Sequence, residues 1–409
     1  MDYHIIPEVL APAGDEERLD AALLFGADAV YLSGTEFGMR AACANFDREG
    51  LKRAVAKTHA VGKKIYVTCN ILPRNKDIGA LPAYFSYLNE IGVDALIISD
   101  IGTMEIAKQY APDCALHIST QFGVVNYATA TALYHMGAKR VVLARELSLD
   151  EIREIRANTP PELELEAFVH GAICMSFSGR CVISNYLTDR DANHGECSQP
   201  CRWKFTVVEE TRPNLPMTIE QDEKGTYLFN SNDMNMIAHV AALADAGIAS
   251  LKIEGRAKTF YYSAVTANAY RHAVDGYVAS GFSAEYIPEE WIVEEMNKIS
   301  HRPYGTGFYF GMPSQHLKEG GYIREYEVAA VVEGWKDGYL ITTQRNRFYP
   351  NQELDVLEPC EKPFTFTPSI LLNEDNDAIA SANHPMMTVY IPFEHPLKKG
   401  TLLRCKKST

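Results

Sequence analysis

A short unit of strand, turn, amphipathic helix and glycine recurs through the first two thirds of the chain, and it constrains the fold more than any other feature. The glycine stands after the helix and before the next strand, at residues 26–29, 92–95, 137–140 and 247–250. Glycine is typical of this place because the backbone beyond a helix end often enters the left-handed region, which glycine adopts without a steric cost. Each of the four segments therefore predicts one helix-to-strand turn.

Eight strands of this kind can be counted. They are predicted at residues 9–11, 29–33, 64–70, 95–100, 115–119, 140–144, 163–169 and 250–253. Helical patterns lie between them, and Ser148 and Glu151 have the spacing of a capping box at the start of one. Strict alternation of strand and helix predicts a parallel sheet, and eight units favour a closed (β/α)8 barrel of the TIM type. An open, doubly wound sheet is the alternative that the periodicity leaves open.

One strand-to-helix connection is much longer than the others. We expect an insertion at residues 171–233, after the seventh strand, within a barrel domain of residues 1–277. Strand-to-helix connections lie on the carboxyl face of such a barrel, where active sites are built. A helical linker at 278–308 and a small C-terminal β domain at 309–409, barrel-like and made of short alternating strands, complete the predicted organisation.

The insertion carries four of the nine cysteines, Cys174, Cys181, Cys197 and Cys201, within 28 residues. Four thiolates around one centre suit an iron–sulfur cluster or a zinc ion, and the spacing does not choose between them. Zinc is disfavoured because neither pair has the two-residue gap of zinc ribbons. Unligated buried cysteines are a third interpretation. Among the isolated cysteines, Cys43 follows the second strand and is expected on the same barrel face.

Polar side chains accumulate close to the predicted strand ends and in the insertion. The candidates for binding a substrate with carboxylate or phosphate groups, from charge and placement only, are Arg40, Arg145, Arg180 and Arg256. His170 and Glu254 are the candidates for proton transfer, although a hydrogen-bonded core histidine is the ordinary interpretation of His170. Any single residue of this kind is more often a cap or a solvated loop residue.

The chain is acidic as a whole, with a formal net charge of −14. This charge opposes non-specific attraction to nucleic acid, so a role in RNA binding requires a segregated basic face. Two segments offer one: residues 345–349, where arginines and aromatic residues interleave, and a tail containing Lys398, Lys399, Arg404, Lys406 and Lys407. A solvated hairpin and a charged terminus explain the same residues equally well.

Several function classes lose support from motifs that the sequence lacks. It contains no His-Glu-x-x-His, no Gly-x-Ser-x-Gly and no phosphate-binding loop ending in Gly-Lys-Ser/Thr, so the common routes to hydrolysis are missing. The start of the chain has no basic stretch followed by an apolar one, and no apolar run approaches the length of a membrane span. We expect a cytoplasmic protein without membrane association, in which clustered cysteines bind metal rather than form disulfides.

Taken together, the motifs resemble those of a known family, the collagenase-like proteins of peptidase family U-32. The resemblance is carried by residues 8–14, 26–32, 37–40, 170–174, 178–181, 190–193, 197–202 and 251–256. Residues 301–304 and 306–308, with the C-terminal β domain, are similar to the bacterial branch of that family that hydroxylates tRNA.

The resemblance implies a barrel fold and an oxygen-sensitive iron–sulfur cluster, which we expect to be of the 4Fe–4S type. Cys174, Cys181, Cys197 and Cys201 would be its ligands, and Cys43 competes with Cys174 because some relatives use a cysteine near that position. In this branch the activity is 5-hydroxylation of the wobble uridine of tRNA, with prephenate required as a partner metabolite. The arginine candidates would then bind the carboxylates of that metabolite.

Two other functions remain open. The historical name of the family implies a peptidase. The other is a non-catalytic RNA- or protein-binding module whose cysteines hold structural zinc.

Overall fold

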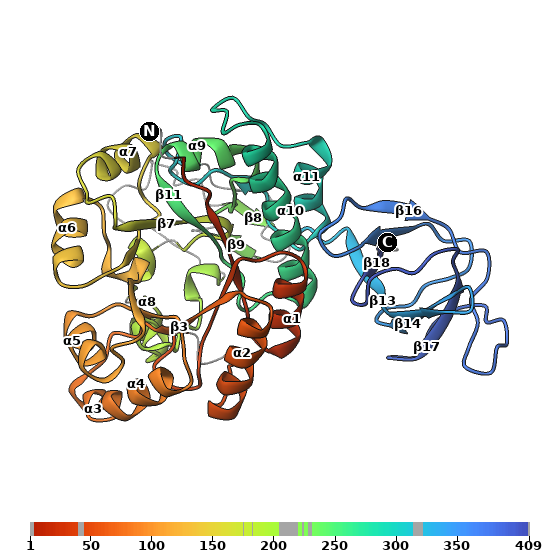
Figure 1. Cartoon of the computed structure of the whole chain (residues 1–409), viewed down its shortest axis with the longest axis horizontal. Helices are drawn as coiled ribbons and strands as arrows, with labels where there is room; N and C mark the ends of the chain where they lie inside the picture. Colours follow the sequence, from red (N-terminus) through yellow and green to blue (C-terminus); the bar gives the residue numbers. More distant parts are fainter. Residues whose placement is uncertain are drawn as a thin grey trace.

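The computed structural model describes residues 4–39, 45–174, 176–181, 183–203, 220–222, 225–227, 231–313 and 322–407. Within them, eight parallel strands form a closed barrel, as predicted from the sequence (Figure 1). Around the ring these are β1 (Glu8–Pro12), β2 (Ala29–Leu32), β3 (Lys64–Cys69), β4 (Ala95–Ile98), β5 (Ala115–Ile118), β6 (Arg140–Val142), β7 (Glu164–Ala172) and β11 (Ile248–Ile253). The ring closes because β11 pairs in parallel with both β1 and β7.

Helices cover the outside of the barrel (Figure 1). They are α1 (Glu16–Leu24), α2 (Arg48–Ala60), α3 (Asn75–Ile78), α4 (Leu81–Glu90), α5 (Ile101–Tyr110), α6 (Tyr127–His135), α7 (Leu149–Ala157), α9 (Val240–Asp245) and α10 (Phe260–Ala279). In the insertion lies α8 (Ile183–Thr188), and after the barrel comes α11 (Glu290–Glu295). Short 3-10 turns are η1 (Thr120–Phe122), η2 (Phe177–Gly179), η3 (Ala192–His194), η4 (Pro200–Arg202), η5 (Ile237–His239) and η6 (Met296–Lys298).

The ends of these helices follow from local sequence. Asp47, Asp100 and Asn126 each accept a hydrogen bond from a backbone N–H three residues on, which satisfies a donor that the first helical turn leaves unpaired. The predicted capping box of Ser148 and Glu151 is present in α7.

The glycines that mark the repeat have the expected conformation. Gly26, Gly92, Gly137 and Gly247 have φ angles of 100°, 80°, 107° and 85°. A side chain at these positions would be strained, which explains why glycine stands beyond the helix end in each unit. The four predicted helix-to-strand turns are therefore confirmed.

Two short strands that the sequence did not predict extend the sheet beside β7. Residues of β10 (Asp233–Asn235) pair antiparallel with the end of β7, and β12 (Tyr304–Gly305) pairs in parallel with β10. A strand of two or three residues is too short to produce a periodic pattern. A further hairpin of β8 (Glu220–Asp222) and β9 (Gly225–Tyr227) lies in the insertion.

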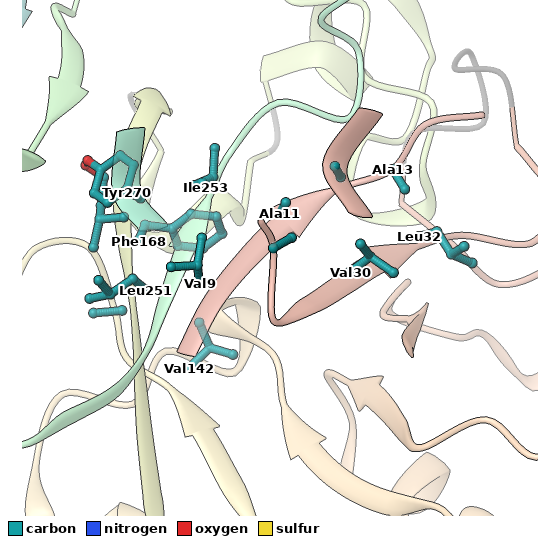
Figure 2. Packing of buried hydrophobic residues seen from close by; sticks show 14 of the residues in the cluster. Val9, Ala11, Ala13, Val30, Leu32, Val142, Phe168, Leu251, Ile253 and Tyr270 are labelled. Carbon is teal, nitrogen blue, oxygen red and sulfur yellow. The ribbon is translucent and has the colours of Figure 1, made fainter. Parts of the chain in front are cut away.

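The main apolar core lies between the strands and the helices around them. Val9, Val30 and Leu251 from neighbouring strands are fully buried there, with Tyr270 of α10 packed beside them (Figure 2). Alternate residues of the same strands point into the barrel, where Leu10 belongs to a smaller apolar cluster.

The barrel interior also contains a buried ion network. Arg140 Nη1 lies 2.8 Å from Glu8 Oε1 and 3.0 Å from Glu166 Oε2, and Lys252 Nζ lies 2.6 Å from Glu166 Oε1. Burial on its own would raise the pKa of Glu166, but Lys252 and Arg140 hold that pKa below its ordinary value. Because Glu8 and Arg140 are the first residues of their strands, this network fills the amino-terminal end of the barrel and leaves the carboxyl end for a cavity.

The C-terminal region forms a separate antiparallel sheet, shown in blue in Figure 1. Its strands are β13 (Tyr326–Lys336), β14 (Tyr339–Gln344), β15 (Leu354–Leu357), β16 (Phe364–Phe366), β17 (Thr388–Pro392) and β18 (Leu402–Lys406), in the order β16-β15-β18-β13-β14-β17. A tight turn at Asp337 and Gly338, both with positive φ, joins β13 to β14. The sheet packs over its own apolar core, which includes Val332, Leu340 and Phe348.

A buried ion network fastens this sheet to the barrel. Arg404 of β18 is completely buried, with Nη1 2.6 Å from Glu295 Oε2 of α11 and Nη2 2.7 Å from Asp355 Oδ1 of β15. Lys298 pairs with the same two carboxylates. Burial on its own would lower the pKa of Arg404, but Tyr261 and Glu295 raise it above the ordinary value. The two domains therefore share desolvated charges, which fixes their relative position.

Of the helices that the structure describes, even α10, with 20 residues, lacks the apolar stretch that a membrane span requires.

We predict that Arg404→Met destabilises the protein by about 3–5 kcal/mol, because it leaves two buried carboxylates with only Lys298 as a cationic partner. Urea unfolding followed by circular dichroism measures the change. The matched control is Lys362→Met, which breaks the exposed ion pair with Glu289 and should have little effect. Equal effects of the two substitutions would contradict the assigned role of Arg404.

Candidate active site

A cavity of about 980 Å³ opens at the carboxyl ends of the barrel strands. Asn70, Ser119, Arg145 and Glu254 line it, and each follows closely after the end of a barrel strand. Parallel strands bring their carboxyl ends to one side of a barrel, which is why residues so far apart in the chain meet here. The volume is at the upper end of the range for small-molecule sites.

All four cysteines of the insertion line this cavity. Cys174 and Cys197 are exposed, Cys181 and Cys201 are partly buried, and none of the eight described cysteines forms a disulfide. The topology thus brings together the thiols that the sequence singled out. Cys43, their predicted competitor, lies outside the described residues.

The arrangement of the thiols bears on what they can bind. Among the described side chains, no three from His, Cys, Asp and Glu lie close enough together to hold a single metal ion. A tetrahedral zinc requires four sulfurs at about 2.3 Å from one centre, whereas in a cluster each thiolate binds a different iron. The four thiols that line the cavity are the soft sulfur ligands that both an iron–sulfur cluster and a zinc ion take, so their chemistry fits either group.

Asn193 holds the backbone of Cys181 in place. Its Oδ1 accepts a hydrogen bond from Cys181 N at 3.1 Å, and its Nδ2 donates to Cys181 O at 2.8 Å. The carbonyl of Asn193 in turn accepts from Leu72 N at 2.9 Å, and Arg74 pairs with Asp191. The insertion is therefore tied to the segment that follows β3. Sequence reasoning did not assign this role, although Asn193 lies in a segment that carries the family resemblance.

The segment around Cys197 is held by hydroxyl groups. Ser198 N donates to Ser184 Oγ at 3.0 Å, and Ser198 Oγ lies 2.9 Å from Ser184 Oγ and 3.0 Å from Thr188 Oγ1, both on α8. Gln199, the next residue, has a positive φ of 56°. A non-glycine residue in this conformation is uncommon, and here it turns the chain between Cys197 and Cys201.

Two of the four candidate arginines line the cavity. Arg145 Nη1 donates to Ala172 O at 3.0 Å, its Nη2 lies 3.3 Å from Glu254 Oε2, and its guanidinium carbon lies 3.8 Å from the ring centroid of Phe168. Arg256, 5% exposed, donates from Nη1 to Thr68 Oγ1 at 3.3 Å. Both guanidinium groups are thus held in fixed orientations, as binding sites for planar anions require.

The other two candidates are placed differently. Arg180 is exposed, donates from Nε to the carbonyl of Gln121, and is not among the residues that line the cavity. Arg40 lies outside the described residues.

His170 is a buried structural residue. Tyr270 Oη lies 3.5 Å from its Nδ1 and Tyr304 Oη 3.4 Å from its Nε2, and it does not line the cavity. Burial, with smaller effects from Lys258 and His301, lowers the pKa of His170 to about 3, so the ring is neutral at physiological pH. His170 is therefore neutral and enclosed, which agrees with its ordinary interpretation as a hydrogen-bonded core histidine.

Glu254 is the candidate for proton transfer that does line the cavity. It is 8% exposed, and its backbone N–H donates to the carbonyl of His170 at 2.8 Å. Its own carbonyl accepts from Tyr262 Oη at 2.8 Å. These backbone bonds connect His170 to the site, so the histidine helps to position Glu254 without reaching the cavity.

Sequence reasoning missed the contribution of residues beyond the barrel. Tyr322, Arg324, Arg345 and Lys407 also line the cavity, although they lie outside the barrel strands and their connections. Arg345 and Lys407 were candidates for RNA binding from their composition alone, and nothing local indicated that they face the same cavity as the cysteines.

Together, the fold and the cavity define a (β/α)8-barrel protein with a thiol-lined site that a second domain helps to enclose. The described residues lining the site include seven basic side chains and two acidic ones, which suits an anionic ligand.

The chain belongs to peptidase family U32. The pattern of that family matches residues 14–319, and the pattern of the U32 C-terminal domain matches residues 324–404. The chain is 34% identical over 403 residues to tRNA hydroxylation protein P1 of Bacillus subtilis strain 168, covering 97% of this chain and 94% of that protein. It is 35% identical over 436 residues to tRNA hydroxylation protein P of Escherichia coli K12, covering 96% and 95%. A 23S rRNA 5-hydroxycytidine synthase of the same bacterium is 35% identical over 308 residues, covering 75% of this chain and 43% of that protein.

The lowered pKa of His170 predicts a pH dependence of stability. Below the pKa of about 6.5 of an unfolded histidine, the unfolded chain binds a proton that the folded protein does not, so the free energy of unfolding falls as the pH falls towards 3. Between pH 7 and pH 5 this residue should account for roughly 2 kcal/mol of the decrease.

Urea unfolding of His170→Gln at the two pH values measures this contribution. The substitution lowers stability at both pH values, but the decrease between them should be smaller than in the unsubstituted protein. The control is His135→Gln, which changes an exposed residue of α6. An identical pH dependence in His170→Gln and the unsubstituted protein would show that His170 is not the buried neutral group described above.

Proposed function

We propose that this protein is an iron–sulfur enzyme that hydroxylates uridine in tRNA at carbon 5, with prephenate as a partner metabolite. The similarity to two tRNA hydroxylation proteins over nearly the whole length of the chain carries the proposal. The similarity to an rRNA 5-hydroxycytidine synthase supports the same class of reaction, hydroxylation of a pyrimidine in RNA.

The chemistry of the reaction is consistent with the residues in the cavity. Replacing the C5–H bond of uridine with a C5–OH bond is a two-electron oxidation, which requires an oxygen donor and an electron acceptor from outside the chain, and a redox group at the site would carry the electrons between them. Cys174, Cys181, Cys197 and Cys201 would hold the cluster, with Cys43 as the alternative to Cys174. When bound, such a cluster supplies electron transfer in one-electron steps.

The deep part of the cavity would bind the carboxylate metabolite. Arg145 and Arg256 supply fixed guanidinium groups, and Lys252 adds a positive charge beneath them. Glu254 is ion-paired with Arg145, so a bound carboxylate would compete for this arginine. We assign to Glu254 the transfer of a proton at its Oε atoms, because it is the candidate that lines the cavity.

A peptidase activity, which the family name implies, ranks second. Among the described residues that line the cavity there is no histidine. The nucleophile–histidine pair on which serine and cysteine peptidases depend is therefore not found among them.

The function is tested in a bacterial strain whose tRNA lacks 5-hydroxyuridine. We expect a plasmid carrying the unsubstituted chain to restore 5-hydroxyuridine or its derivatives, measured by mass spectrometry of digested tRNA, and Glu254→Gln to restore much less. The control is Glu333→Gln, an exposed residue of β13 outside the cavity. Failure of the unsubstituted, iron-loaded protein to restore the nucleoside would contradict the proposed function.

The cluster is tested by metal analysis after anaerobic purification. We expect iron and acid-labile sulfide together with a brown colour, and loss of all three in Cys181→Ser and Cys201→Ser. Cys360→Ser is the matched control, because Cys360 is exposed but not among the residues lining the cavity.

The same measurement separates the alternatives for the fourth ligand and for the metal. If Cys174→Ser keeps its iron and Cys43→Ser loses it, Cys43 is the ligand. Colourless protein containing one zinc ion would instead favour structural zinc and remove the redox role.

A further inference from the structure

Resting on the proposed function, we infer that Arg324, Arg345 and Lys407 form a rim that binds phosphates of the RNA beside the nucleotide that enters the cavity. These three residues come from the C-terminal region and line the same cavity as the cysteines. No single element of the chain brings them together, because they stand before β13, after β14 and after β18.

The charge distribution supports an anionic ligand at this rim. The chain contains 39 Lys and Arg against 53 Asp and Glu, yet the described cavity lining has seven basic and two acidic residues. The two acids are Glu254, paired with Arg145, and Glu327. Concentration of positive charge at one opening of an otherwise acidic protein is the segregated basic face that RNA binding requires.

The deep and outer cations of the cavity differ in their partners. Lys252 is held by Glu166, and Arg145 by Glu254 and a carbonyl. At the rim, Lys407 is exposed and its side chain has no partner among the described residues. Arg324 is also exposed, and within the described part of the chain its one hydrogen bond goes to Ser300 Oγ, at 3.2 Å. Lys407 and Arg324 are therefore available to a ligand from solvent, as groups that bind a polymer backbone must be.

Arg345 is oriented towards the cavity by its contacts. Its Nη2 lies 3.0 Å from the exposed Glu17 of α1, its guanidinium carbon lies 5.3 Å from the Phe260 ring centroid, and its Nε is buried without a hydrogen-bond partner. Arg345 thus spans the junction of the two domains, held by Glu17 of α1 and by the ring of Phe260.

Tyr322 lines the cavity beside these residues. Its ring centroid lies 4.0 Å from Lys258 Nζ and 5.7 Å from the guanidinium carbon of Arg324. Cation–π contacts of this kind restrict where the charges lie without neutralising them. The buried network at Arg404 fixes the whole domain on the barrel, so the rim is positioned before RNA arrives.

The cavity is large enough for both ligands of the proposed reaction. About 980 Å³ exceeds what one small dicarboxylate fills, and the rim residues line the same space. A nucleotide that enters from the rim side would leave its neighbouring phosphates at Arg324, Arg345 and Lys407. We therefore favour RNA over an acidic protein as the ligand of the rim.

The test removes the three rim charges together. We expect the triple variant Arg324→Gln, Arg345→Gln, Lys407→Gln to bind unmodified tRNA at least tenfold more weakly, measured by fluorescence anisotropy with iron-loaded protein. The slope of log affinity against log salt should decrease by about 0.7–0.9 for each phosphate that the variant no longer neutralises. The control variant Lys108→Gln, Lys336→Gln, Lys362→Gln removes three exposed charges outside the cavity and should keep the slope of the unsubstituted protein.

Iron content and the thermal unfolding midpoint establish that both triple variants are folded. If the unsubstituted protein binds tRNA and the rim variant binds it with the same affinity and salt slope, the rim does not bind RNA phosphates. The inference is then wrong, and the proposed function stands. If the unsubstituted protein does not bind tRNA, the proposed function fails. A rim variant that loses affinity for polyglutamate but not for tRNA would show that the rim binds acidic protein, which also overturns the inference.

Discussion

The parallel pairing of β11 with both β1 and β7 closes the barrel, and the position of the candidate site depends on this closure. Closure of the sheet places the carboxyl ends of eight strands around one opening, and the residues that follow them become neighbours whatever their distance in the chain. The buried ions of Glu8, Arg140 and Glu166 occupy the opposite end of the ring. The only place left for a large cavity is the end at which the cysteine insertion emerges.

The insertion is not an independent module resting on the barrel. Asn193 holds the backbone of Cys181 and accepts a hydrogen bond from Leu72, so one of the proposed cluster ligands is coupled to the segment after β3. Such contacts around metal ligands usually matter for metal affinity nearly as much as the ligands. The orientation of the thiols therefore depends on barrel residues far from them in sequence.

Much of this arrangement could be predicted because it has a local signal. Glycine beyond each helix end marks the strand–helix units, and a long connection after a strand places the four cysteines on the carboxyl face. His170 stands at such a strand end too, but β7 there pairs with β10 as well as with β11, and three tyrosines surround the ring. The buried position agrees with the ordinary interpretation of His170 as a core histidine, although nothing local indicates the three-residue strand beside it.

The sequence has no local pattern that predicts the rim of the cavity either. The antiparallel pairing of β13 with β14 and β18 brings Arg324, Arg345 and Lys407 together. The docking at Arg404 places them at the cavity of the cysteines, and docking depends on complementary surfaces rather than on periodicity. In the segment 345–349, Phe348 is completely buried in the core of the C-terminal sheet, so stacking on a base is not available to it. Composition identified the segment, and only the fold distinguishes its surface residues from its core.

The division of the site between two separately folded units has an evolutionary consequence. The thiols and the deep arginines belong to the barrel, whereas part of the entrance belongs to a sheet held by a handful of buried charges. Exchange or remodelling of that sheet can alter which polymer gains access while the reactive centre stays intact. Related proteins with this two-domain arrangement can therefore differ in the molecules they bind while they keep the same reaction.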